Sequence, residues 1–374
     1  MDARDVVEHF VTSENRVHLL RILREGPASQ SDLSDCCSMS LPTVSRRCDD
    51  LEERGWVQIH ADQYKLTGAG AIVLRTYDNA VETVGRNGHN DLDYLAGSEN
   101  RVRFLRALQD GPTEEAELKD DLSKSTVQRH KDGLSERGFI NWYGSDCRLT
   151  VSGEHALNVY DSLLRTIEQV EDKNSFLRNI GVRCAGLPAE TLSEAEVVYN
   201  SYSHPVRIAD RFRERVERGF DHCWVLSSRY TEADVAAVHR AIDDGAKLTV
   251  MSPLPSHDVL PTDSTELKYM RRGINRNAID WRIYPNELPI NMVVFDANEV
   301  MLITTDQPGE EQQVQAMLRS ENDELVTWAL NLLESYHNES KPPLTYLYTR
   351  LRNAGVNEVL SYIDILPKPI TGSG

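Results

Sequence analysis

Hydrophobic and polar positions follow two different patterns along the chain. Up to about residue 180, apolar residues recur every three or four positions, which predicts a series of amphipathic helices. From residue 181 to about 340, short apolar runs alternate with helical stretches, which is typical of an α/β domain with a mixed sheet. The pattern therefore predicts a helical N-terminal half and a C-terminal half built around a sheet.

The helical half contains an internal repeat. The sequence of Ser13–Val17 returns at Ser98–Val102, 85 positions later, and that of Glu53–Gly55 returns at Glu136–Gly138, 83 positions later. The two-residue deletion falls in a predicted loop, which readily absorbs a change of length. We therefore predict two copies of one domain.

Each copy is predicted to contain three helices followed by a β-hairpin. Ser13 and Ser98 stand where N-caps are expected, and a Gly-Pro pair ends the first helix of each copy. In the first copy, Pro42 suits the first turn of the third helix and Gly55 ends that helix. The remaining elements expected are a short polar helix over residues 30–37 or 114–122, and hairpin strands over residues 56–59 and 64–67.

A further helix is expected after each hairpin. In the first copy it covers residues 70–84 and leads into a linker over residues 85–90. In the second copy it is predicted to continue from about Glu154 to Ile180, which is longer than a domain-closing helix needs. An amphipathic helix of this length either separates the two chains of a dimer or packs on its own domain, and the sequence favours neither.

Strands and helices then alternate in the C-terminal half. Helices are expected over residues 206–218, 232–243 and 322–337, and strands over residues 197–201, 223–228, 247–252, 281–284, 291–295 and 300–304. The last two strands are joined by Asp-Ala-Asn-Glu, which suits a hairpin turn. Residues 341–374 are expected to form a tail with two short helices and a disordered end.

Helix, glycine stop and hairpin in this order resemble the winged helix-turn-helix regulators. The Gly-Ala-Lys-Leu-Thr-Val-Met-Ser stretch and the Val-Val-Phe-Asp hairpin resemble effector domains of archaeal TrmB-like and methanogenesis-regulator proteins, which are related to the phospholipase D-like fold. The fold class implied is a multidomain α+β protein. Its parts would be two tandem winged helix-turn-helix domains (residues 1–85 and 90–155), a connecting or dimerisation helix (156–180), a degenerate phospholipase D-like α/β effector domain (181–340) and the tail (341–374).

The third helix of each copy carries the residues expected to contact DNA. Helix-turn-helix proteins read base edges and phosphates with the N-terminal half of this helix, where arginine suits guanine and glutamine suits adenine. His130 is expected either to contact phosphate or to face solvent, and Gly133, where the first copy has Asp50, costs about 1 kcal/mol of helix propensity. The DNA-binding residues predicted, wing residues included, are Thr43, Ser45, Arg46, Arg47, Lys65, Ser125, Thr126, Gln128, Arg129, Lys131 and Arg148.

The acidic composition changes the expected mode of binding. The net charge is −18, from 59 acidic and 41 basic residues, and only nine of the basic residues are Lys. Such a composition resembles proteins of halophilic archaea, in whose molar salt the Debye length is ~3 Å, so a negative total charge hardly opposes DNA binding. The other interpretation is a protein that does not bind nucleic acid. The six scattered cysteines are predicted to be reduced structural thiols, with a redox sensor as the alternative.

No familiar cofactor or hydrolase signature is present in the sequence. GxGxxG, Walker, GxSxG and HExxH motifs are all absent, and neither His204 nor His257 begins the HxKxxxxD pattern of phospholipase D-like nucleases. A sensor domain without catalysis or cofactor is therefore expected. Its candidate residues for an anionic or sugar ligand are Tyr202, His204, Arg207 and Arg211, although the same charges also suit a solvated helix surface.

These observations together predict a cytoplasmic transcription regulator of a halophilic archaeon. The cytoplasmic location is expected because the first residues, Met1–Asp5, lack the basic-then-apolar order of a signal peptide and the sequence shows no run of about 18 apolar residues. The family resemblance implies double-stranded promoter DNA as the partner, a homodimer, and a C-terminal domain that senses a small molecule or mediates association. Two alternatives stay open, a module that recruits transcription factors through its winged helices and a phosphodiesterase.

Overall fold

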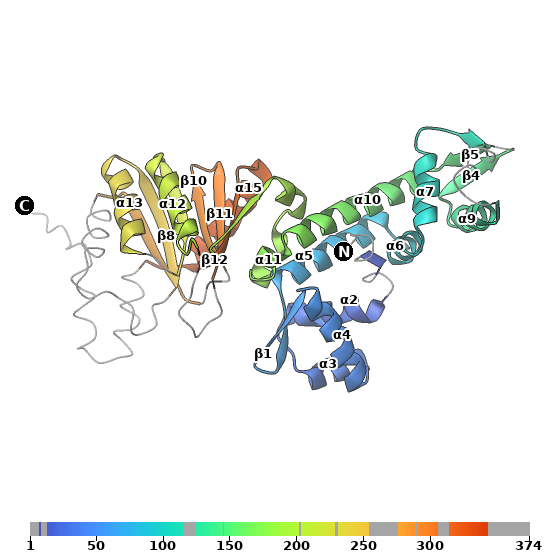
Figure 1. The fold of residues 1–374 in the computed structure, drawn as a ribbon, viewed down its shortest axis with the longest axis horizontal. Helices are drawn as coiled ribbons and strands as arrows, with labels where there is room; N and C mark the ends of the chain where they lie inside the picture. The colour runs from blue at the N-terminus through green and yellow to red at the C-terminus, as the bar shows by residue number, and fades with distance from the viewer. Residues whose placement is uncertain are drawn as a thin grey trace, which may run out of the picture. The chain divides into compact units, whose positions relative to one another are not determined.

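The computed structural model divides near residue 178 into two compact units, which are described separately (Figure 1). It describes residues 7–8, 13–114, 124–144, 146–201, 203–228, 231–253, 276–286, 288, 290–305 and 314–342. Much of the predicted second short helix (114–122) and nearly all of the predicted tail lie outside these residues. Within the described part of the chain, no helix has the length and apolar character needed to cross a membrane.

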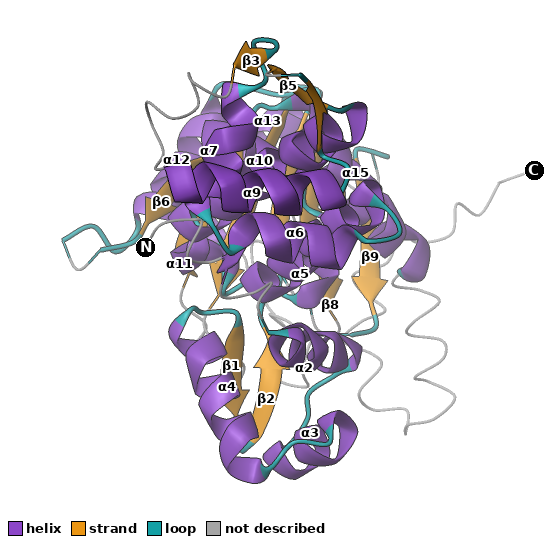
Figure 2. Cartoon of the chain, turned by 90° about the vertical axis from the view of Figure 1, so that its right-hand side faces the viewer, coloured by secondary structure: helices purple, strands orange, loops and turns teal. Residues whose placement is uncertain are grey.

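The first copy, residues 13–84, has the predicted order of three helices, a hairpin and a closing helix (Figure 2). Pro42 lies in the first turn of the third helix, and Gly55 has a φ of +72°, which is the left-handed conformation that ends a helix. Ser13 stands at the predicted N-cap, but its side chain makes no capping hydrogen bond. The elements are α2 (Glu14–Glu25), α3 (Gln30–Cys37), α4 (Leu41–Glu53), β1 (Val57–His60), β2 (Gln63–Leu66) and α5 (Gly68–Val84).

The second copy, residues 98–172, differs from the prediction at both of its ends. A helix begins at Gly88 inside the predicted linker, and the predicted long helix stops at Asp172, where Lys173 separates it from a short helix. The long helix packs on α5, so its apolar face is covered by its own chain. The elements are α6 (Gly88–Ala96), α7 (Glu99–Ala107), β3 (Thr113–Glu114), α9 (Lys124–Glu136), β4 (Ile140–Tyr143), β5 (Asp146–Leu149), α10 (Val151–Asp172) and α11 (Asn174–Leu177).

In each copy, a glycine in the first turn of the closing helix lies against the backbone that leads into the hairpin. A Cβ on Gly70 would lie 2.2 Å from the carbonyl oxygen of Trp56, and one on Gly153 would lie 2.1 Å from that of Phe139. No side chain fits at such distances, so glycine allows the helix to approach the backbone that enters the hairpin. The two glycines are 83 positions apart, as are their two neighbours.

An ion pair fastens the first helix of each copy to the closing helix. Arg21 contacts Asp78 at 2.6 Å, and Arg106 contacts Asp161 at 2.5 Å. The two arginines are 85 positions apart and the two aspartates 83, which are the two offsets of the sequence repeat. The copies therefore share individual contacts as well as their order of elements.

In the described part of the C-terminal unit, seven strands form a mixed sheet with helices on both faces. Strands β7, β8 and β9 are parallel, and the other neighbours are antiparallel, in the order β6-β12-β11-β10-β7-β8-β9. The strands are β6 (Glu196–Tyr199), β7 (His222–Leu226), β8 (Lys247–Pro253), β9 (Ile279–Tyr284), β10 (Asn291–Phe295), β11 (Glu299–Thr305) and β12 (Val314–Ser320). The α-helices are α12 (Arg207–Glu217), α13 (Glu232–Asp243) and α15 (Asp323–Glu339), preceded by 3-10 turns at Val182–Gly186 and Ala189–Glu194.

Helices α12 and α13 cover one face of this sheet, and α15 covers the other. Phe295 and Met301 point into the core beneath α12 and α13, among the apolar residues of the same face. The expected turn between β10 and β11 is present, with Asp296 and Ala297 at positive φ. Strand β12 was not predicted, yet it lies inside the sheet between β11 and β6. A helical N-terminal region and a C-terminal sheet are confirmed.

Candidate nucleic-acid interface

Helix α4 presents one arginine to solvent and holds a second one close to the protein. Arg46 lies on the exposed face, whereas the Arg47 guanidinium is 3.8 Å from a carboxylate oxygen of Asp50. The same oxygen of Asp50 accepts a hydrogen bond from the largely buried Arg16 at 3.1 Å. Arg47 is therefore partly compensated within the protein, and of this pair Arg46 is the one available for a partner.

One of the small polar side chains of α4 makes a hydrogen bond at the start of the helix itself. The hydroxyl of Thr43 is 2.8 Å from that of Ser40, which stands at the N-cap position. Ser45 is half-buried, one position before Arg46. The predicted contact residues of the first copy thus lie in the first two turns of α4, with Arg46 the most open of them.

Helix α9 repeats this arrangement with different residues. Ser125 and Thr126 lie in its first turn, and the structure describes nothing of their side chains. Gln128 and Arg129 are exposed, and the Gln128 amide donates to Asp132 at 2.9 Å. Arg129 stands 83 positions after Arg46, so the same exposed guanidinium recurs in both copies.

Lys131 differs from the rest of the predicted set. Its ammonium group lies 3.8 Å from the centre of the Trp142 ring on β4, which is a cation–π contact within the second copy. Its equivalent in the first copy is the fully buried Cys48. Lys131 therefore stabilises the packing of α9 on the hairpin in addition to any contact with DNA.

His130 neither faces solvent nor lies on an open surface, so the prediction for this residue was wrong. Only 2% of the residue is exposed, and its Nε2 atom has no hydrogen-bond partner among the described residues. Burial lowers the pKa of the imidazole, and the nearby charges of Arg101 and Arg129 lower it further. The ring is part of the core of the second copy.

Gly133 is explained by a tyrosine that lies against it. A Cβ at this position would be 2.2 Å from the hydroxyl oxygen of Tyr94. The guanidinium groups of Arg101 and Arg137 lie 3.9 and 4.2 Å from the centre of the Tyr94 ring. These contacts replace the Arg16–Asp50 pair of the first copy, so the glycine allows different packing behind the third helix.

The hairpins add one basic residue in each copy at equivalent positions. Lys65 on β2 and Arg148 on β5 are exposed and 83 positions apart. Tyr143 was not among the predicted residues, yet it is 60% exposed on the neighbouring strand with its ring centre 5.3 Å from the Arg148 guanidinium. An aromatic residue directly before the Gly144 turn is the signal that would have found it.

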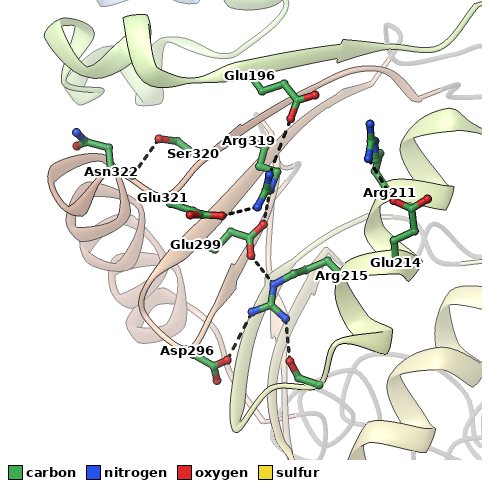
Figure 3. A network of polar contacts seen from close by, with 11 residues as sticks. Glu196, Arg211, Glu214, Arg215, Asp296, Glu299, Arg319, Ser320, Glu321 and Asn322 are labelled. Carbon is green, nitrogen blue, oxygen red and sulfur yellow. Dashed lines mark hydrogen bonds and ion pairs between the residues drawn. The ribbon is translucent and has the colours of Figure 1, made fainter.

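The C-terminal unit holds a separate network of charged side chains (Figure 3). Glu299, which is 5% exposed at its side chain, accepts hydrogen bonds from Nε of both Arg215 and Arg319, the latter at 2.5 Å. Arg215, 10% exposed, also lies 3.5 Å from Asp296. These residues lie on α12, in the β10–β11 turn and on strands β11 and β12. They are far apart in the sequence, so their proximity in the fold was not predicted.

A shallow hollow opens beside this network. Of the three predicted ligand residues that the structure describes, Arg211 lines the hollow and lies 3.3 Å from Glu214, whereas His204 and Arg207 are exposed elsewhere at the start of α12. Tyr202 lies outside the described residues. The lining consists of Glu196, Arg211, Glu214, Arg215, Arg218, Glu299, Met301, Met317 and Arg319.

Comparison with protein families now accounts for most of the chain. A model of the HVO_A0261 N-terminal domain matches twice, over residues 4–88 and 89–172, and a model of the middle domain of the methanogenesis regulatory protein FilR1 matches residues 205–339. The chain therefore contains two domains similar to the HVO_A0261 N-terminal domain and one similar to the FilR1 middle domain. Both sequence copies match one model, and the sheet unit matches the other.

Comparison of the structure gives weaker similarities. TrmBL2, an archaeal chromatin protein, is 15% identical over 71% of this chain and 99% of its own, with a TM-score of 0.32. NucT from Helicobacter pylori is 11% identical over 40% of this chain and 98% of its own, also with a TM-score of 0.32. No curated protein sequence matches the chain.

Proposed function

We propose that this protein is a sequence-specific transcription regulator that binds double-stranded promoter DNA through α4 and α9. In this proposal each copy is a winged helix-turn-helix domain, with α4 or α9 as the recognition helix and the hairpin as the wing. The observation that carries the proposal is the recurrence of one exposed arginine, Arg46 and Arg129, in the N-terminal half of both third helices. An exposed arginine there has the reach and donor geometry for guanine or phosphate.

The distribution of charge along α4 and α9 favours insertion of the N-terminal half of each helix into a DNA groove. Basic residues occupy the first half of α4, whereas Asp49, Asp50, Glu52 and Glu53 occupy its second half. Helix α9 has Arg129 and Lys131 before Asp132 and Glu136. Phosphate groups attract the first half and repel the second, and the positive end of the helix dipole adds to this attraction.

The C-terminal unit has the role of a sensing or association domain in this proposal. The guanidinium groups of its charged network are neutralised by Glu299 and neighbouring carboxylates, and we assign no catalytic step to it. The homodimer, the small-molecule effector and the saline cytoplasm expected from the sequence stay predictions. The primary function rests on the N-terminal unit.

The test compares binding to a duplex from the protein's own promoter with binding to a scrambled duplex, by fluorescence anisotropy in molar KCl. Wild-type protein should prefer the promoter, and Arg46→Ala or Arg129→Ala should each lose about 1–3 kcal/mol of that preference. Arg240→Ala is the charge-matched control, because it removes an exposed arginine from α13 in the other unit. Equal binding to both duplexes, or no effect of either α4 or α9 substitution, would refute the proposal.

A further inference from the structure

The closing helices of the two copies pack on each other in opposite directions (Figure 1). Near one end, Nε2 of His155 at the start of α10 donates to the carbonyl oxygen of Thr83 at the end of α5, at 2.9 Å. Near the other end, Nε1 of Trp56, whose carbonyl oxygen lies against Gly70 in the first turn of α5, donates to Glu171 at the end of α10, at 3.1 Å. The two copies therefore lie at opposite ends of an antiparallel helix pair.

Residues at equivalent positions of α5 and α10 are buried. Tyr77 and Tyr160 are 83 positions apart, and both are almost completely buried, as are Leu74 and its equivalent Leu157. Repeated core positions on both helices are expected when one duplicated element packs against its own copy. The same relationship joins the two chains of a symmetric dimer.

A second pair of contacts has the reciprocity of a two-fold axis. The Asn174 amide, just beyond α10, donates to the carbonyl oxygen of Arg54 at the end of α4, at 2.6 Å. Asp91 in α6, the helix that follows α5, accepts from Arg137 at the end of α9, at 2.8 Å. Arg137 follows Arg54 by 83 positions, and Asn174 follows Asp91 by 83. The contact between Arg54 and Asn174 is thus matched by a contact between their equivalents, Arg137 and Asp91. Such reciprocity defines an isologous interface.

We propose that residues 13–178 form a dimer within one chain, and that a single chain reads a bipartite operator as an imperfect inverted repeat. This inference rests on the proposed function and specifies its partner. A two-fold axis places equivalent residues at the same height along it, so α4 and α9 meet a duplex in opposite orientations, as the two recognition helices of a helix-turn-helix dimer do. A second chain is then not needed to supply the second half-site.

The two half-sites should be similar but not identical. Arg46 and Arg129 are equivalent, so one guanine contact is expected in each half. The preceding residue is Ser45 in one copy and Gln128 in the other, and the following residue is half-buried Arg47 in one and buried His130 in the other. The halves should therefore share the base read by arginine and differ at the position beside it.

Selection from a random duplex pool tests the inference with the full chain. The pool spans about four helical turns, enough for two half-sites at the usual separations. In molar KCl, wild-type protein should enrich two inverted half-motifs, and native mass spectrometry should find one chain on each enriched duplex. Arg46→Ala should erase the shared base from one half alone and Arg129→Ala from the other half alone, with Arg240→Ala changing neither.

Insertion of about five base pairs, half a helical turn, between the halves should reduce affinity to that of an isolated half-site. Enrichment of a single half-motif, or two chains per duplex with Arg46→Ala erasing both halves, would overturn the inference while the proposed function stands. A direct repeat would overturn it as well, because it contradicts the two-fold relationship. Failure to enrich any motif would remove the proposed function and the inference together.

Discussion

The indole nitrogen of Trp56 donates a hydrogen bond to the Glu171 carboxylate 3.1 Å away, and this bond joins the first copy to the last turn of α10. Trp56 is fully buried, so loss of this acceptor would remove a hydrogen bond at a place that solvent does not reach. Glu171→Ala should reduce the free energy of unfolding by about 1–3 kcal/mol, measured by denaturant titration. Glu168→Ala, an exposed substitution on the same helix, is the control and should change it by no more than about 0.5 kcal/mol.

The same carboxylate should make stability depend on pH. Burial raises the pKa of Glu171, although the Trp56 hydrogen bond and the charge of Arg54 oppose this effect. A carboxyl whose pKa is higher in the folded state stabilises it most below the unfolded pKa, and this contribution is lost as pH rises through the folded pKa. The fall in stability above about pH 4.5 should be smaller in Glu171→Gln, and an unchanged profile would contradict the assignment.

His130 should act in the opposite direction. Its pKa is lowered by burial and by two neighbouring arginines, so the folded protein disfavours the charged ring. Since the unfolded chain takes up the proton first, stability should fall as pH drops below about 6.5. His130→Phe should remove this part of the decline in thermal unfolding experiments. His18, exposed on α2, supplies the control substitution, which should leave the decline intact.

Gly133→Ala should destabilise the protein although alanine is the better helix former. The added methyl would collide with the Tyr94 hydroxyl, and overpacking of this kind costs about 1–3 kcal/mol. Tyr94→Phe removes the hydroxyl, so the double variant should recover much of the loss in a double-mutant cycle. Additive effects of the two substitutions would show that the contact is not the cause.

Glu299→Ala should be the most damaging change in the charged network. It leaves Arg215 and Arg319 without their shared acceptor, and removal of one partner of a buried ion pair costs about 3–5 kcal/mol. Glu321, also bonded to Arg319, is exposed, so Glu321→Ala should cost less than about 1 kcal/mol. Equal losses for the two variants, measured by chemical denaturation, would argue against a buried network.

Local signals in the sequence were sufficient to predict most of the helices and strands. Helix α13 has its predicted bounds because Thr231 and Asp234 form a capping box at its start. Strand β12 was missed because its polar residues interrupt the apolar run, and its place inside the sheet depends on pairing with β6, more than a hundred positions earlier. Pairing over such a distance leaves no local pattern.

Single residues of the site were harder to predict for the same reason. Position within the third helix predicted DNA contacts for Arg46 and Arg129 and an open position for His130; the two arginines are exposed, whereas His130 is buried. The reason is the replacement of the Arg16–Asp50 pair by the packing of Tyr94 against Gly133, which the local sequence does not show. A repeat in sequence thus predicts equivalent backbones more reliably than equivalent side-chain environments.

The antiparallel packing of α5 and α10 has a consequence for how the protein responds to its own abundance. Because both helices belong to one chain, their association is intramolecular, and dilution does not separate the two copies. Two separate chains that had to pair first would occupy a site in proportion to the square of their concentration when scarce. A single chain carrying both surfaces gives occupancy proportional to the first power, and hence a graded response at low expression.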